Sequence, residues 1–418
     1  MKIKYQIVMG ILGAVIAFQP IHASESAPSA FGLGFDVQKF YRPFTSKEIT
    51  SENQQTWPYY KSVSSHWDTY AAHGTSKIKH SNNPAKLTVA KNDKSFNLNI
   101  EFKDGKSFIQ SFQDTQVKGF IVMKDNNIIF EFYDNGFMTE DTNLLQSASK
   151  TFAGVITGQL VDKGLLAPNN KVEKYLKDFK GTSIGKATVQ QVLDMTSGIP
   201  QLLDFHTPGA EGYNFEIEQG LKKGKSIGHR NAIKSSQSIA KPGKEWNYND
   251  KNTDILALLA EKVTRKKYPQ LLSELFDSFG ANYDGSIAKT SDGTSSPSYG
   301  ISITARDYAL FHQWIAQGKG PESYYKSAMD TSKTEFGQNE TGKLLGTDIT
   351  YGSQTYYLKD EDILYSSGSF GQVGFSDMKT GTSIVFLQDW AVNAELDKFK
   401  KTRERSFKIL EYIRSNNM

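Results

Sequence analysis

Strand-like and helix-like patterns of apolar residues occupy different parts of this chain. Two apolar runs, residues 119–123 and 128–132, flank the polar residues 124–127, and this arrangement predicts a β-hairpin. Beyond it, apolar residues recur at helical spacing as far as Gly164, a residue suited to end a helix. The residues with this spacing are Phe152, Val155, Ile156, Leu160 and Val161.

The same distinction extends to the rest of the chain. Alternation predicts strands between residues 87 and 112, with Asp104-Gly105 as a turn, and again at 349–352 and 355–389. Helical spacing dominates from 150 to about 330, with loops expected at 198–214, 222–231 and 280–300. A last amphipathic helix is expected over 395–414, with inward-facing Leu396, Phe399, Phe407, Leu410 and Ile413.

This order of elements predicts an α/β fold. Both chain ends would build an antiparallel sheet flanked by helices, and an all-α lobe, about residues 165–345, would be inserted between them. We expect a signal peptide at 1–23, an N-terminal extension partly packed on the sheet at 24–114, and the main domain at 115–418. The aromatic-rich segment 57–70 could line the mouth of a site, but packing on the core is favoured.

The N-terminus has the features of a secretory signal. Lys2 and Lys4 precede an apolar run over residues 7–18, which is too short to span a bilayer, and a small-residue cleavage site ends at Ala23. No second candidate span follows, so no membrane association is expected once the signal is removed. The chain has no cysteine, which favours a bacterial envelope, and we expect a periplasmic or secreted protein.

Composition excludes several kinds of partner. The net charge is +4, and two of these charges belong to the signal peptide, so nothing favours nucleic-acid binding. The seven histidines lack metal-ligand spacing, and no nucleotide-binding fingerprint is present. We therefore expect neither a metal nor a cofactor, and the sequence leaves the oligomeric state open.

The motif Ser147-Ala148-Ser149-Lys150 is the first candidate for chemistry. One helical turn separates its serine from its lysine, which places a hydroxyl within reach of an amine that can activate it as a nucleophile. The alternative is a helix N-cap at Ser147 with a solvated Lys150, and this segment alone does not decide between them. The same spacing occurs, without a hairpin before and a buried helix after, from Ser76, Ser183, Ser238, Ser286, Ser323 and Ser376.

Two later segments carry groups that could assist. Tyr248 follows Pro242-Gly243 and precedes a helix expected over 253–263, where its phenol, its pKa lowered by an ammonium, could shuttle a proton. A structural role is the alternative for one of 20 tyrosines. The Gly-rich segment 365–372 predicts a strand whose Ser369 N–H could join that of Ser147 in binding an oxyanion; the alternative is a β-bulge.

The order of these three elements resembles that of the serine β-lactamase and penicillin-binding protein superfamily. Residues 193–199 resemble its "L-x-M-T-S-G" turn, and residues 299–307 resemble its "G-L-x-x-T-A-x-D" segment. The resemblance covers about residues 115–415. It is strongest to class C β-lactamase-related hydrolases, especially 6-aminohexanoate-dimer hydrolases and family VIII esterases.

The resemblance implies a β-lactamase/transpeptidase-like fold and a serine hydrolase acting on a small-molecule amide or ester. Ser147 would form the acyl-enzyme, while Lys150 and Tyr248 would move protons, with the choice of base left open. Backbone N–H groups of Ser147 and Ser369 would bind the oxyanion. Supporting positions would be Asp250, Ser367, Gly368 and Gly371.

The chain departs from the superfamily pattern at two places. Asp250 replaces the usual Asn or Ser, so it would either raise the pKa values of Lys150 and Tyr248 or cap the helix near Thr253. Residues 366–368 read Ser-Ser-Gly instead of Lys-Thr-Gly, which argues against penicillin-like substrates. A literal Lys-Thr-Gly at 379–381 falls in the following hairpin turn.

Two other functions are kept as alternatives, and one other motif is rejected. The alternatives are a penicillin-recognising enzyme of the β-lactamase or DD-peptidase type and a non-catalytic binding protein of the same fold. Residues 181–185 match the G-x-S-x-G elbow of α/β-hydrolases, but the charged helical segment 175–180 stands where that elbow needs an apolar strand.

Overall fold

The computed structural model describes residues 44–415, apart from residues 46, 91–101, 103, 104, 107–110, 113, 114, 135, 333–348 and 391–395. The expected signal peptide and residues 91–101, part of the region in which alternation predicts strands, lie outside the described residues. Among the residues described, no helix combines the length and the apolar character needed to cross a membrane.

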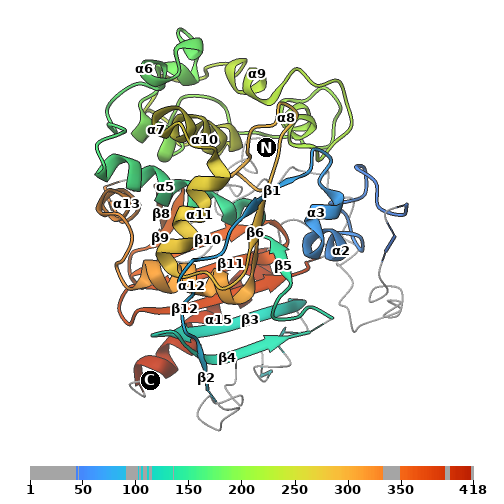
Figure 1. Cartoon of the computed structure of the whole chain (residues 1–418), viewed down its shortest axis with the longest axis vertical. Helices are drawn as coiled ribbons and strands as arrows, with labels where there is room; N and C mark the ends of the chain where they lie inside the picture. The colour runs from blue at the N-terminus through green and yellow to red at the C-terminus, as the bar shows by residue number, and fades with distance from the viewer. Residues whose placement is uncertain are drawn as a thin grey trace, which may run out of the picture.

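An eight-stranded sheet draws its strands from both ends of the chain (Figure 1). Its order is β2-β4-β3-β12-β11-β10-β9-β8, and its neighbours are antiparallel except for the short edge pair β2 and β4. The predicted hairpin is β3 and β4, and Asp125 and Asn126 between them take the positive φ of a two-residue turn. The strands are β2 (Thr88–Val89), β3 (Val117–Lys124), β4 (Asn127–Tyr133), β8 (Ile349–Gly352), β9 (Thr355–Leu358), β10 (Ile363–Gly368), β11 (Gln372–Asp377) and β12 (Thr382–Gln388).

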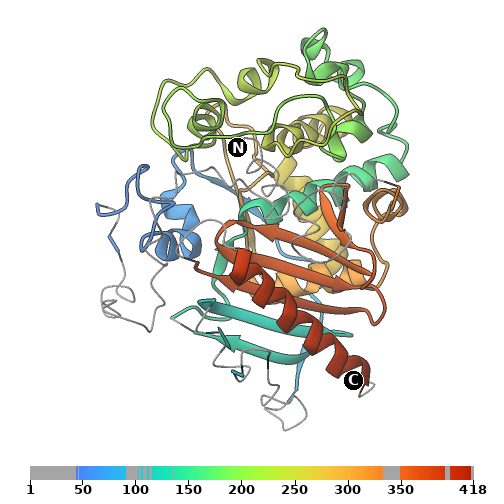
Figure 2. The ribbon, with the colours of Figure 1, turned by 180° about the vertical axis from the view of Figure 1, so that it is seen from behind.

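Helices cover both faces of this sheet. The C-terminal helix α15 (Leu396–Ser415) lies across one face (Figure 2), while α12 (Ala305–Ala316) packs on β3, β11 and β12 from the other. Successive residues of β3 divide between the two layers: Phe120 and Val122 pack with the α15 core, Ile121 and Met123 with the core of the helical lobe. Phe399, Leu410 and Ile413 of α15 are buried as expected, and Phe407 is partly buried.

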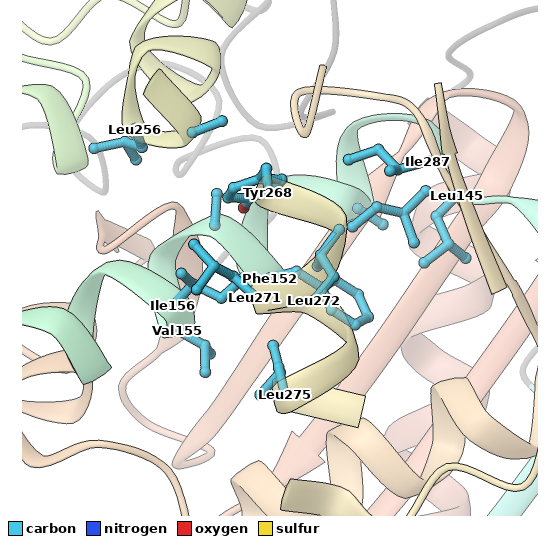
Figure 3. Close-up of a cluster of buried hydrophobic side chains, with 14 of the residues drawn as sticks. Leu145, Phe152, Val155, Ile156, Leu256, Tyr268, Leu271, Leu272, Leu275 and Ile287 are labelled. Carbon is cyan, nitrogen blue, oxygen red and sulfur yellow. The ribbon is translucent and has the colours of Figure 1, made fainter. Parts of the chain in front are cut away.

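The helical lobe lies between the two strand-forming parts of the chain, and the expected fold class is confirmed. Its core gathers around α5, α10 and α11, where the labelled Phe152, Leu256 and Leu272 lie among the buried side chains (Figure 3). The lobe's helices are α5 (Lys150–Asp162), α6 (Val172–Tyr175), α7 (Val189–Leu193), α8 (Glu211–Gln219), α9 (His229–Lys234), α10 (Asp250–Thr264), α11 (Tyr268–Phe279) and α13 (Glu322–Ala328). Short 3₁₀ turns are η2 (Gln146–Ser149), η3 (Lys177–Phe179), η4 (Ile184–Lys186) and, in the large sheet, η5 (Ser369–Gly371).

A second sheet of four strands has the order β1-β6-β7-β5. It corrects the expectation of a loop over 280–300, because β6 lies within that range, and it adds strands to a region expected to be helical. These strands have only three or four residues, too few for alternation to show, and all four residues of β7 are buried. Their bounds are β1 (Thr75–Ile78), β5 (Thr142–Leu144), β6 (Gly285–Ala288) and β7 (Ile301–Thr304).

The N-terminal segment packs against this second sheet and the helical lobe. It forms α2 (Tyr60–Ser65) and α3 (Trp67–Tyr70), which lie beside β5 (Figure 1). Val63 and Trp67 join a buried cluster with Leu144 of β5. The aromatic-rich segment thus contributes to the core, as favoured from the sequence.

Candidate active site

Ser147 lies on the short 3₁₀ turn η2, between the end of β5 and the start of α5. The preceding residue, Gln146, takes φ +52°, which turns the chain sharply out of the strand. The helix itself begins only at Lys150, with Ser149 as its N-cap residue, so the alternative of an N-cap role for Ser147 is wrong. Instead, the hydroxyl of Ser147 accepts a hydrogen bond from Lys150 Nζ at 2.9 Å.

Lys150 is buried, so the alternative of a solvated lysine is also wrong. Its ammonium donates to the backbone carbonyl of Ser298 at 2.6 Å and lies 2.8 Å from Asp250 Oδ1. Burial penalises the charged form and lowers the pKa of Lys150, while the neighbouring Asp250 carboxylate opposes this effect. Three polar partners therefore fix the amine beside the Ser147 hydroxyl.

Tyr248 closes the other side of the Lys150 amine. The lysine Nζ lies 4.9 Å from the centre of the Tyr248 ring, and the phenol interacts with the Ser147 side chain. The sequence suggested a lowered pKa for this phenol, but burial, reinforced by the Asp250 charge, raises the pKa of Tyr248 well above its usual value. In the resting site this tyrosine is thus a neutral phenol.

Asp250 is the first residue of α10, and its carboxylate lies beside the Lys150 ammonium. The alternative of Asp250 as the cap of a helix starting near Thr253 is wrong, because the helix begins at Asp250 and Asn249 caps it by accepting the Lys251 N–H at 2.9 Å. Burial raises the pKa of Asp250, against the pull of Lys150. Its charge acts on Lys150 and Tyr248 in the expected upward direction, although for Lys150 burial outweighs it.

The Gly-rich segment reaches the serine turn through Gly368. A Cβ at Gly368 would overlap the carbonyl oxygen of Leu145 and come within 3.0 Å of the Ala148 nitrogen, so the strand end and η2 are in direct contact. This contact places Ser369, the next residue, beside Ser147. Ser369 begins the 3₁₀ turn η5.

Two other residues of this segment have contacts within the sheet or with Trp390. Ser367 is buried and pairs with Val373 in the ladder between β10 and β11. A Cβ at Gly371 would overlap the ring of Trp390, so Gly371 permits tight packing there. These observations assign neither residue a contact with the Ser147 side chain.

Comparison with known proteins agrees with this arrangement. A family model described as Beta-lactamase matches residues 119–407. The chain belongs to the β-lactamase family. The family and fold expected from the sequence motifs are thereby confirmed.

Relatives of this β-lactamase-family protein include hydrolases. The 6-aminohexanoate-dimer hydrolase of Paenarthrobacter ureafaciens is 29% identical over 212 residues, which are 50% of this chain and 54% of that relative. The match thus spans about half the length of the curated relative.

Solved structures share the fold at low identity. A Bacillus anthracis protein provisionally named as a 6-aminohexanoate-dimer hydrolase superposes with a TM-score of 0.79 at 19% identity, over 90% of this chain and 99% of that one. EstCE1, described as a hydrolase with promiscuous acyltransferase activity, gives a TM-score of 0.57 at 15% identity, over 71% and 95% of the two chains.

The β-lactamase-family site also contains groups that sequence reasoning missed. Ser298 holds Lys150 through its carbonyl, and its own N–H donates to Asp254 Oδ1 at 3.0 Å. Asp254 Oδ2 in turn lies 2.8 Å from His229 Nε2, in a fully buried pair. A backbone carbonyl has no side-chain signature, so no sequence motif could have revealed it.

The G-x-S-x-G match at 181–185 and the Lys-Thr-Gly sequence at 379–381 lie away from this site. Ser183 of the G-x-S-x-G match lies between η3 and η4, with no strand before it. Lys379 lies in the turn between β11 and β12, where its ammonium donates to Asp360 O at 3.3 Å. Within the described part of the chain, no cluster of three or more histidines and carboxylates could hold a metal ion.

Proposed function

We propose that this protein is a serine hydrolase that cleaves a small amide or ester through an acyl-enzyme on Ser147. The observation that carries the proposal is the buried contact between Lys150 Nζ and Ser147 Oγ at 2.9 Å, with Tyr248 on the same hydroxyl. A buried amine with a lowered pKa is suited to accept a proton from a serine hydroxyl. A protein that only binds a ligand has no need for these three groups together.

The reaction would proceed in two displacements. Ser147 Oγ attacks the substrate carbonyl, and its proton passes to the Lys150–Tyr248 pair. The tetrahedral intermediate then collapses, the carbon–nitrogen or carbon–oxygen bond breaks, and the same proton leaves with the amine or alcohol. Water repeats the sequence on the acyl-enzyme, which releases the acid and restores Ser147.

Backbone N–H groups would stabilise the developing oxyanion. The direct packing of Gly368 on η2 supports the assignment of the Ser147 and Ser369 N–H groups to this role. Loss of a single donor of this kind lowers kcat by about 10²–10³-fold in serine hydrolases. A large share of the rate enhancement would therefore depend on the relative position of η2 and η5.

The family supports the proposed substrate class, and the N-terminal sequence supports the proposed location. Hydrolysis of a small amide or ester fits the names of the relatives, and the sequence of residues 1–23 supports export, with cleavage near Ala23, to the periplasm or the medium. Nothing in the charge balance favours a nucleic-acid partner.

Labelling with a fluorophosphonate tests the proposal. Ser147→Ala should abolish labelling and lower hydrolysis of p-nitrophenyl esters by several orders of magnitude, while the melting temperature stays close to that of the parent. Ser183→Ala is the matched control and should label normally. Labelling that survives in Ser147→Ala but is lost in Ser183→Ala would overturn the assignment. Absence of labelling and turnover in the parent would favour the non-catalytic binding protein.

The penicillin-recognising alternative makes a different prediction. The Ser366 hydroxyl lies 2.6 Å from the Tyr308 hydroxyl and 2.8 Å from His312 Nε2, and burial lowers the pKa of His312 to about 3, so this position offers no cation. A charge-assisted bond to a penam carboxylate contributes about 1.5–3 kcal/mol, or roughly ten- to a hundredfold in kcat/KM. We expect weak or no turnover of nitrocefin, and efficient turnover by the purified protein would contradict this.

A further inference from the structure

Two residues with positive φ flank the proposed oxyanion donors. Gln146, immediately before Ser147, has φ +52°, and Phe370, immediately after Ser369, has φ +62° and ψ +16°. Neither is a glycine, and the left-handed region is costly for a residue that carries a Cβ. Such conformations persist only where neighbouring groups hold them. The position of both donor N–H groups therefore depends on what packs against Gln146 and Phe370.

Tyr60 is the side chain that reaches both residues. Its ring stacks on that of Phe370, with the ring centroids 3.5 Å apart and the planes inclined by 20°. Its hydroxyl lies near the Gln146 side chain, without a hydrogen bond to it. Tyr60, Gln146 and Phe370 are all buried. The ring of Tyr60 thus packs on the turn after the second proposed donor and lies beside the turn before Ser147.

The backbone around Phe370 is held independently of Tyr60. The Phe370 carbonyl accepts hydrogen bonds from the Trp390 N–H and from Gln372 Nε2, each at 3.2 Å. These bonds fix one side of the peptide, while the ring of Phe370 rests on Tyr60. The contribution of Tyr60 is therefore to hold the ring and, through it, the left-handed turn.

Hydrogen bonds attach the helix that carries Tyr60 to the rest of the protein. Tyr60 belongs to α2, beside β5 (Figure 1), and two later residues of the same helix, Ser64 and Ser65, accept hydrogen bonds from the buried Lys118 Nζ at 2.7 and 3.1 Å. On the other side, Gln54 Nε2 donates to the Leu221 carbonyl at 3.1 Å. The segment lies before residues 119–407, the part matched by the family model.

We propose that Tyr60 is a positioning residue that sets the geometry of the oxyanion site from outside the family-matched part of the chain. The inference rests on the proposed function, since it presumes that the Ser147 and Ser369 N–H groups bind the oxyanion. It assigns the N-terminal segment a role in catalysis. A 1 Å displacement of a group in an active site can lower the rate about a hundredfold, so holding these two turns matters for turnover.

The test compares three variants with the parent. Tyr60→Leu removes the stacked ring, Tyr60→Phe keeps the ring without the hydroxyl, and Tyr59→Leu removes a neighbouring ring that packs on Phe44 instead. For each we would measure kcat and KM on a p-nitrophenyl ester, the affinity for a boronic acid that mimics the tetrahedral intermediate, and unfolding in urea. Active-site titration normalises the rates to the competent fraction.

Tyr60→Leu should lower kcat about ten- to a hundredfold with KM changed less than about threefold, and boronate affinity should fall in proportion to kcat/KM. Tyr60→Phe should stay within about threefold of the parent in kcat, and Tyr59→Leu should match the parent per competent site. A Tyr60→Leu variant that is less stable but has a normal kcat and boronate affinity would overturn the proposal, because the ring would then serve only the core.

Failure of the positioning role can be distinguished from failure of the proposed hydrolase function. If Ser147→Ala abolishes labelling while Tyr60→Leu leaves kcat unchanged, the hydrolase assignment stands and the positioning role falls. If Ser147→Ala retains full activity, the hydrolase assignment itself fails, whatever the Tyr60 variants show.

Discussion

At the scale of single residues, the protonation of the site depends on two opposing effects. Burial favours the neutral amine of Lys150, whereas the Asp250 carboxylate 2.8 Å away favours the ammonium. The same carboxylate disfavours a phenolate at Tyr248. Asp250 therefore makes both candidate bases harder to deprotonate than burial alone would.

Asp250→Asn should shift the pH–rate profile toward lower pH. Without the anion, the pKa values of Lys150 and Tyr248 both fall. The deprotonated base is then populated at lower pH, so the ascending limb of the kcat/KM profile moves to lower pH. An opposite charge this close shifts a pKa by about 1–3 units. The expected direction is the same whichever residue is the base. The measurement is kcat/KM for a p-nitrophenyl ester across pH, with urea unfolding in parallel.

Glu322→Gln is the control for this experiment, since Glu322 is a first-turn acid of another helix, α13. It should leave the profile unchanged. An unchanged profile in Asp250→Asn, accompanied by a lower melting temperature, would show that Asp250 serves only the start of α10.

The sequence predicted the site's side chains better than its backbone contacts. Ser147 and Lys150 lie together as their three-residue spacing indicated, because that spacing is a local property, whereas Tyr248 was tied to them only by the resemblance to the superfamily. The Ser298 carbonyl and the ring of Tyr60 reach the site through tertiary packing alone. No local pattern marks such contacts.

At the scale of elements, the contact between β10 and η2 determines how the two turns that carry the proposed oxyanion donors meet. At Gly368 the backbones of β10 and η2 lie so close that a side chain would overlap the carbonyl of Leu145. The strand pattern predicted β10, whereas η2 was expected as the start of the helix that in fact begins at Lys150. The short strands β6 and β7 were not predicted, because their few residues show no alternation. Only their pairing with β1 and β5 makes them strands.

Gly368→Ala should separate these elements. The added methyl would push the end of β10 away from η2, so kcat should fall at least about tenfold, and overpacking should lower the free energy of unfolding by about 1–3 kcal/mol. Rates normalised by active-site titration, together with urea unfolding, provide the measurement.

Gly185→Ala is the matched control, because its Cβ would overlap the Phe179 carbonyl in a part of the helical lobe that supplies no site residue. It should lose stability with a normal kcat per competent site. An equally normal kcat in Gly368→Ala would show that the site tolerates this displacement.

At the scale of the whole molecule, a buried ion pair joins three distant parts of the chain. Lys118 Nζ on β3 contacts Asp389 Oδ1 at 2.9 Å as well as the two serines of α2, and both charged side chains are about 1% exposed. Such a pair is costly to desolvate, but loss of one partner leaves the other charge buried alone.

Asp389→Asn should therefore lower the free energy of unfolding by about 3–5 kcal/mol. Adding Lys118→Met should cost less than the sum of the two single changes, because the second change removes the stranded charge. Lys266→Met, which breaks the exposed pair with Glu274, should cost under about 1 kcal/mol. The measurement is urea unfolding of Asp389→Asn, Lys118→Met, the double variant and Lys266→Met. If the losses of unfolding free energy in the two single variants add up exactly to the loss in the double variant, Lys118 and Asp389 are not coupled.

The central pairing of the large sheet joins residues that are far apart in the sequence. Residue 382 of β12 pairs with residue 124 of β3, and β10, which contacts η2, belongs to the same C-terminal group of strands. Contacts so distant in sequence form late and slowly, because a very long loop must close first. Until β10 has joined the sheet, a chain that already carries Ser147, Lys150 and Tyr248 lacks the strand that the proposed oxyanion site needs. Under the proposed function, hydrolytic activity would therefore appear only after this long-range pairing has formed.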